Sequence, residues 1–191
     1  MIDSKLLAKD KPTCNIHACD FDNTTFGSSA SRIDSSIQFK ALNHETVIPF
    51  EDHYFDYVIG SGVLEHCALE RESLKEVRRI LKDDGIFIIT FLPNRYSWSE
   101  CLARVLKKGH HRRLYSIKYI TRLLLNHGFV PMECGYHQLL PSLSSAGAFM
   151  RPLIGSGLSR IWFIDKHLGK LPLLQMISAN IYIVAQRKNF V

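Results

Sequence analysis

Two neighbouring groups of residues have the types and spacing that could do chemistry. Gly60, Ser61 and Gly62 follow a short apolar run of aromatic and β-branched residues, which is typical of a strand buried on both faces of a parallel sheet. Open α/β sheets bind ligands at the carboxyl ends of their strands, and glycine lets a ligand approach the main chain closely. We therefore expect a ligand crevice at this point of the chain.

Glu65 and His66 follow in the next loop and could form a catalytic pair or bind a metal ion. Adjacent residues on a helix do not face the same way, and no third ligand occurs at a matching spacing. The sequence favours a structural role for this pair, so no metal site is predicted.

The composition indicates one globular domain in a reducing compartment. The 191 residues carry a formal net charge of +6, which fits a solvated basic surface or, alternatively, contact with an anionic ligand, a membrane surface or nucleic acid. The five cysteines are widely spaced and form no Cys-x-x-Cys pair, so neither a disulfide framework nor a cysteine zinc site is indicated. The opening residues MIDSKLLAKDK lack the apolar core of a signal peptide, and we expect a cytoplasmic protein.

Hydrophobic periodicity predicts alternating strands and helices. Strands are expected over residues 15–19, 37–42, 55–59, 86–92, 129–137 and 181–186, and helices over 69–81 and 117–127. Ser116 is expected to cap the second helix and Gly128 to end it, while Asp83-Asp84-Gly85 should form a turn with a positive φ at the glycine. The predicted class is α/β with a mainly parallel sheet.

The order of three segments carries a family resemblance: PFEDHYFDYVIGSGVLEH, then DDGIFIITFLPN, then LYSIKYITRLLLNHGF. Residues 15–129 resemble the class I S-adenosylmethionine (SAM)-dependent methyltransferases, in particular their type 11-like small-molecule branch. The resemblance implies a Rossmann-like three-layer sandwich in a single domain over residues 1–191. Residues 15–130 would form the cofactor-binding core, and the apolar segment 139–174 would form a lid over the substrate or a membrane-facing surface.

The resemblance also implies roles for residues at the strand ends. Asp20 would accept hydrogen bonds from the ribose hydroxyls of SAM, and Phe21 would lie against the adenine. Asn43 and His44 stand where the family usually keeps an aspartate that reads the adenine amino group, and the Asn43 oxygen can still accept from it. The backbone groups that would meet the methionine part are those of Gly60, Ser61 and Gly62.

The family's strongest signature, a first strand ending in Asp/Glu-x-Gly-x-Gly-x-Gly, is not found before Asn15, so we expect a fold truncated at its amino end. In this family the first strand lies between the strands predicted here at 15–19 and 55–59. Removing it would leave a slot of ~9.6 Å, twice the spacing of neighbouring strands. The chain could be a shortened form of an enzyme, the flanking strands could pair directly, or another segment or partner chain could fill the slot.

Methyl transfer needs a base only when the acceptor must lose a proton. The candidates are His110, His111, Tyr115 and His137, and the first choices for a catalytic role are His111 and Tyr115. The basic cluster KKGHHRR lacks interleaved aromatic residues, so no nucleic acid is expected as a partner.

Three functions remain open from the sequence. The first is a methyltransferase of a small organic acceptor such as a lipid, quinone or sugar-linked precursor. The second is a non-catalytic methyltransferase-like subunit or regulatory binding protein, favoured by the missing glycine loop. The third is a peripheral membrane module that uses the basic and aromatic carboxyl-terminal third.

Overall fold

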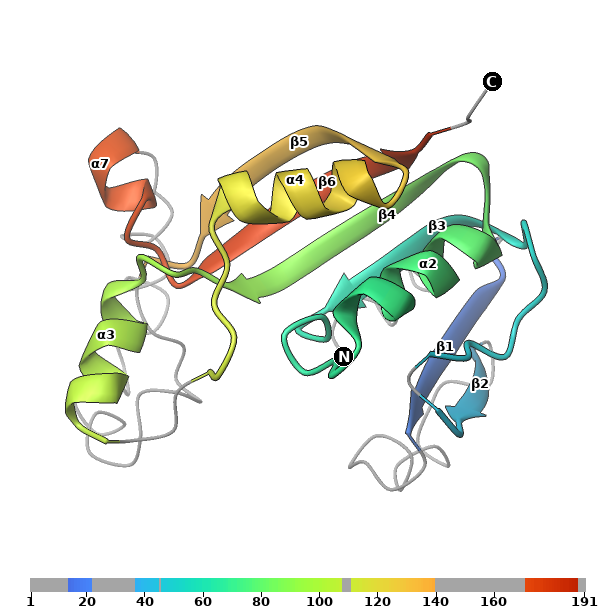
Figure 1. Cartoon of the computed structure of the whole chain (residues 1–191), viewed down its shortest axis with the longest axis horizontal. Coiled ribbons are helices and arrows are strands. Elements are labelled where there is room, and N and C mark those ends of the chain that lie inside the picture. Colours follow the sequence, from blue (N-terminus) through green and yellow to red (C-terminus); the bar gives the residue numbers. More distant parts are fainter. Residues whose placement is uncertain (1–13, 22–36, 45, 108–110, 140–170, 189–191) are drawn as a thin grey trace.

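The computed structural model describes residues 14–21, 37–44, 46–107, 111–139 and 171–188 (Figure 1). The elements in chain order are β1 (Ile16–Phe21), β2 (Ile37–Leu42), β3 (Phe55–Ser61), α2 (Glu70–Ile80), β4 (Leu81–Pro93), α3 (Trp98–Val105), α4 (Ile117–Asn126), β5 (Phe129–His137), α7 (Pro172–Gln175) and β6 (Asn180–Arg187).

The described strands form two separate sheets. β1 and β2 pair in parallel, and the second sheet has the order β3-β4-β6-β5. β3 and β4 are parallel, whereas β6 runs antiparallel to both β4 and β5. The α/β class is confirmed, but the parallel pairing holds only for the first four strands. Among the described strands, β1 and β3 do not pair with each other, so direct closure of the predicted slot is not observed.

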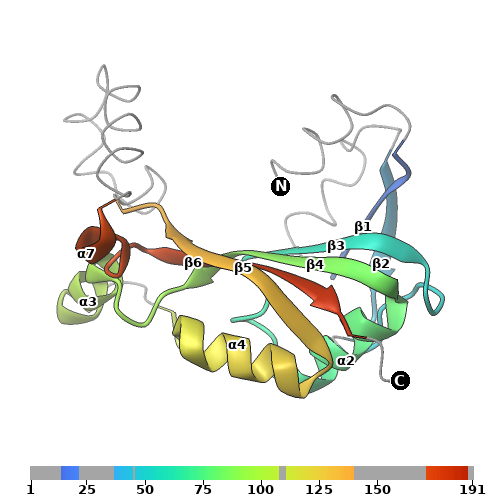
Figure 2. The same ribbon diagram turned by 90° about the horizontal axis from the view of Figure 1, so that it is seen from above.

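The helices α2 and α4 lie on the same face of the four-stranded sheet (Figure 2). Their buried side chains, such as Leu74 and Leu124, join Ile89, Phe129 and Ile183 of the strands in one hydrophobic core. On β3 the side chain of Tyr57 is 65% exposed. The described residues therefore supply two of the three predicted layers.

The helix signals around Ser116 are confirmed. The Ser116 side chain accepts a hydrogen bond from the Tyr119 amide, and Gly128 follows the helix with a φ of 80°. The turn expected at Asp83-Asp84-Gly85 is not found: these residues lie within β4, at an irregularity in its pairing with β3, and the positive φ belongs to Asp84 and not to Gly85. Gly85 is needed for space instead, since a Cβ there would lie 2.9 Å from the Lys82 carbonyl oxygen.

Several expectations lie outside the described residues, namely residues 140–170 of the predicted lid 139–174, the amino-terminal segment 1–13 and His110. No helix in the described part of the chain is long and apolar enough to span a membrane.

Arg79 fixes the turn before β3 onto α2. Its guanidinium pairs with Glu76 at 2.9 Å and Asp52 at 2.7 Å, and it donates to the carbonyl oxygens of Phe50 and Ile48, both at 2.8 Å. The Ile48 amide in turn donates to Glu76. This network sets where the chain enters β3, because the turn carrying those carbonyls leads directly into the strand.

We expect Arg79→Ala to lower the free energy of unfolding by ~1–2 kcal/mol, the range for charge-assisted hydrogen bonds after allowance for solvent screening. Lys75→Ala is the matched control, because Lys75 lies on the same helix and has an exposed ion pair with Glu72. Loss of this ion pair should lower the free energy of unfolding by about 0.5 kcal/mol or less. Urea unfolding measures both, and equal losses would contradict the anchoring role of Arg79.

The same network should make stability pH-dependent. The hydrogen bond from Arg79 holds the pKa of Glu76 below its ordinary value of 4.5. A carboxyl whose pKa is lower in the folded chain stabilises the fold above its unfolded pKa, and this stabilisation disappears as the pH falls through the folded pKa. The stability difference between wild type and Glu76→Gln should be largest near neutral pH and shrink below pH 4.5. A difference that is constant with pH would contradict this assignment.

Candidate functional site

Two predicted parts of the cofactor site lie next to each other at the carboxyl ends of β1 and β2. Asp20 pairs in register with Ala41 and Phe21 with Leu42, so the loop with Asn43 and His44 begins beside Phe21. One carboxylate oxygen of Asp20 accepts from the Phe21 amide at 2.8 Å. A carboxylate has acceptor sites beyond this bond.

The third predicted part lies at the carboxyl end of β3, on the other sheet. Gly62 has a φ of 60° and its amide donates to the Thr90 carbonyl oxygen at 3.0 Å, so the chain turns sharply there. The positive φ explains the glycine, because other L-residues rarely adopt it. At Gly60 a Cβ would meet Phe87 at an ordinary 3.4 Å, so that glycine is not required sterically.

The two sheets meet at their amino ends. The His17 ring of β1 packs edge-on against Phe55 of β3 with ring centroids 5.4 Å apart. From there the strands diverge toward their carboxyl ends (Figures 1 and 2). The nucleoside-binding half and the methionine-binding half of the predicted site thus lie on separate sheets, and the joint cofactor role of these residues stays a prediction.

A hollow of about 480 Å³ lies beside this junction and not at the carboxyl ends of the strands. It is lined by His17 and Gln38 of the strands, by the turn 47–51, and by Lys40, Tyr54 and Arg79. Lys40 stands over the Phe50 ring at 4.6 Å from its centroid. None of the residues that line this hollow is a predicted cofactor residue.

Tyr115 holds the loop that follows β3. It is fully buried, and its hydroxyl donates to Glu70 at 2.6 Å and to the Leu64 carbonyl oxygen at 3.3 Å. Burial, with Glu70 beside it, raises the pKa of Tyr115 far above its ordinary value. The hydrogen-bond partners of this phenol thus lie inside the protein, where they give Tyr115 a structural role, and its catalytic role stays a prediction.

Arg113 ties the same loop to the segment before α4. Its guanidinium donates to the Cys67 carbonyl oxygen at 2.6 Å and to that of Leu64 at 3.4 Å. Together with Tyr115 it places the segment 111–115 against the loop 62–67.

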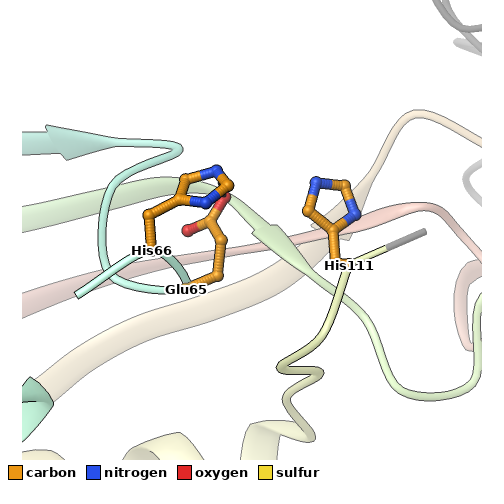
Figure 3. Close-up of side chains that lie close together, drawn as sticks. All are labelled: Glu65, His66 and His111. Atoms are coloured by element: carbon orange, nitrogen blue, oxygen red, sulfur yellow. Dashed lines mark ion pairs between the residues drawn. The ribbon is translucent and has the colours of Figure 1, made fainter. Parts of the chain in front are cut away.

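This contact brings His111 close to Glu65 and His66 (Figure 3). The His111 Nδ1 lies 2.7 Å from an oxygen of Glu100, and the His111 amide donates to the other oxygen of that carboxylate at 3.2 Å. Burial raises the pKa of Glu65, and its own backbone hydrogen bond and the two nearby histidines offset this only in part. His137, a further candidate base, lies at the end of β5 with its ring 4.9 Å from that of Phe91.

Sequence reasoning missed Glu100 and the grouping of His111 with Glu65. The two belong to segments joined only by tertiary contacts, so no spacing along the chain indicates them. The signal available was weak: a histidine 11 residues after a glutamate at the start of a helix.

A family model described as a methyltransferase domain matches residues 3–89. This match covers less than half of the chain, and over these residues it bears out the resemblance to the methyltransferases.

Two curated relatives match parts of the chain. An uncharacterized protein of Methanocaldococcus jannaschii is 46% identical over 61 residues, which are 31% of this chain and 24% of the relative. YrhH of Bacillus subtilis, named as a methyltransferase, is 31% identical over 78 residues, which are 41% of this chain and 43% of the relative. The matches thus span less than half the length of both curated relatives.

Solved structures extend the likeness to nearly the whole chain. One is a Haloferax volcanii protein, named as a methyltransferase, in complex with the Trm112 methyltransferase activator: TM-score 0.68, 13% identity, 98% of this chain and 77% of that one. Another is Haemonchus contortus phosphoethanolamine N-methyltransferase 2 in complex with SAM: TM-score 0.61, 17% identity, 97% of this chain and 46% of that one. At these identities the likeness shows the fold alone.

The structural role of Tyr115 can be tested with Tyr115→Phe, which leaves Glu70 without its shortest hydrogen bond. We expect a loss of ~1–3 kcal/mol in the free energy of unfolding, because a buried carboxylate loses a donor. Tyr119→Phe is the control: the exposed Tyr119 bonds the same carboxylate at 3.3 Å and should cost less. A Tyr115→Phe variant as stable as wild type in urea would contradict the anchoring role.

Proposed function

We propose that this chain acts as a SAM-dependent methyltransferase on a small organic acceptor. The observation that carries the proposal is the match of residues 3–89 to a methyltransferase domain, with acidic and glycine residues at the carboxyl ends of parallel strands. A lipid, quinone or sugar-linked precursor is the class of acceptor that we infer from the small-molecule branch.

The residues present fit the proposed cofactor in type. Asp20 is half-buried and keeps carboxylate acceptor sites beyond its bond to Phe21, which suits the two ribose hydroxyls. Phe21 and Asn43 lie beside it for the adenine, and Gly60, Ser61 and Gly62 offer backbone groups for the amino-acid part. When bound, SAM supplies an activated methyl group, and the protein's share is to align the acceptor atom with it.

His111 is the described residue best placed to take a proton from an acceptor. The Glu100 carboxylate holds its Nδ1, so the Nε2 atom carries the free lone pair. Its loop packs against the loop at the carboxyl end of β3, where the acceptor must approach. The wide spacing of the five cysteines, with no Cys-x-x-Cys pair, supports the proposed reducing, cytoplasmic compartment.

A second candidate function is a non-catalytic subunit that pairs with another chain. The observation that favours it is the division into two sheets, with β1 and β3 unpaired to each other among the described strands. A strand of a partner chain added there would satisfy main-chain groups at both edges. The Haloferax volcanii structure, in which a protein of the same fold is bound to an activator, supports a partner of this kind.

Calorimetric titration of the purified chain with SAM separates these functions. The methyltransferase proposal predicts micromolar binding, and Asp20→Asn should weaken it at least tenfold because the amide loses one acceptor for the ribose. Asp56→Asn is the matched control, since Asp56 lies at the start of β3 and pairs with Lys82. Absence of binding to the wild-type chain would contradict the first function and favour the second.

A further inference from the structure

Three side chains that can bind a metal ion converge where the loop after β3 meets the segment after α3. Glu65 and His66 come from the first and His111 from the second (Figure 3). One ligand atom from each lies within 4.8 Å of the other two. The sequence predicts no metal site because it offers no third ligand near Glu65 and His66, and the fold supplies that ligand from 45 residues further along.

One oxygen of the Glu65 carboxylate has no hydrogen-bond partner in the described part of the chain, although the side chain is almost completely buried. Its side chain is only 4% exposed, and the nearest histidine nitrogen, Nε2 of His66, is 3.8 Å away, which is too far for a hydrogen bond. The oxygen Oε2 is buried and has no hydrogen-bond partner among the described residues. Burying an ionised carboxylate is costly unless a cation or donors compensate for it.

Glu100 prepares His111 to be a ligand. Because the Glu100 carboxylate lies 2.7 Å from Nδ1 of His111, that nitrogen carries the proton and Nε2 keeps its lone pair. A histidine ligand whose other nitrogen donates to a carboxylate is the usual arrangement at zinc sites. Glu100 is therefore a positioning residue, acting through His111.

We propose that Glu65, His66 and His111 form a binding site for a divalent cation, with zinc the preferred ion. Two imidazoles and one carboxylate, with a fourth position open to water, form a ligand set typical of catalytic zinc. Tetrahedral zinc with bonds of ~2.0–2.1 Å needs ligand atoms roughly 3.3 Å apart. The His66 side chain, 70% exposed, can rotate to close the remaining separation.

The open position gives the ion a role in the reaction, and this role rests on the proposed methyltransferase function. A hydroxyl or thiol of the acceptor bound to the ion would lose its proton to solvent water more readily, because a metal ion lowers the pKa of a bound group. His111 would then hold the ion and would not itself act as the base.

Zinc titration of the full, metal-free chain, in competition with a chromophoric chelator, tests the site. We expect one equivalent to bind at micromolar or lower Kd. His111→Gln, His66→Gln and Glu65→Gln should each weaken binding at least tenfold, and Glu100→Gln by 10–100-fold, the range for partners behind a ligand. Circular dichroism of each variant checks that the fold is retained.

Two controls exclude other sources of zinc binding. His127→Gln removes a histidine at the far end of α4, and Cys67→Ser removes the thiol that follows His66 in the sequence. Both should bind zinc as the wild type does. Binding that survives His111→Gln, binding that is lost in Cys67→Ser, or no binding to the wild type would overturn the proposal. The zinc titration contains no SAM, so its result does not depend on whether the chain binds SAM.

Discussion

Hydrogen bonds from Arg113 and Tyr115 to the main chain of the loop after β3 are the constraint on which the candidate site depends. That loop leaves β3 by a positive-φ glycine, and its carbonyl oxygens at Leu64 and Cys67 accept these hydrogen bonds, that of Leu64 in addition to one from the Cys67 amide. A buried carbonyl without a donor is costly, so the donors arriving from the segment before α4 hold both segments in one position. As a consequence of this contact, a ligand atom of His111 lies within 4.8 Å of one of the buried Glu65 side chain.

The two sheets are the second feature from which function follows. β3 pairs with β4 on one side, and β1 with β2, while the aromatic contact of His17 with Phe55 joins the sheets only near their amino ends. A ligand that contacts the carboxyl ends of both β1 and β3 would therefore bind to two separate sheets. Ligand or partner binding at this edge would change how the two sheets are held together.

Much of the fold could be predicted from the sequence where one local signal dominates. The strand Ile37–Leu42 is predicted from its alternating sequence, and Ser116 and Gly128 bound α4 because capping is decided by neighbouring residues. The antiparallel direction of β6 could not be predicted, since it depends on the pairing of β6 with β4 and β5, which no local sequence signal sets. Within β4 the positive φ belongs to Asp84, whereas Gly85 is required because a Cβ there would lie 2.9 Å from the Lys82 carbonyl oxygen, a contact that sequence propensities do not indicate. The convergence of His111 on Glu65 is likewise set by tertiary hydrogen bonds.

Anomalous diffraction at the zinc absorption edge, from crystals of the zinc-loaded chain, tests the central claim most directly. The central claim is that the loop after β3 and the segment 111–115 together form a metal site at the carboxyl end of β3. The account predicts one anomalous peak bonded to Glu65, His66 and His111, with the Glu100 carboxylate behind His111. A peak at a cysteine thiol, or density that leaves these three side chains without an ion while zinc binds elsewhere, would contradict it.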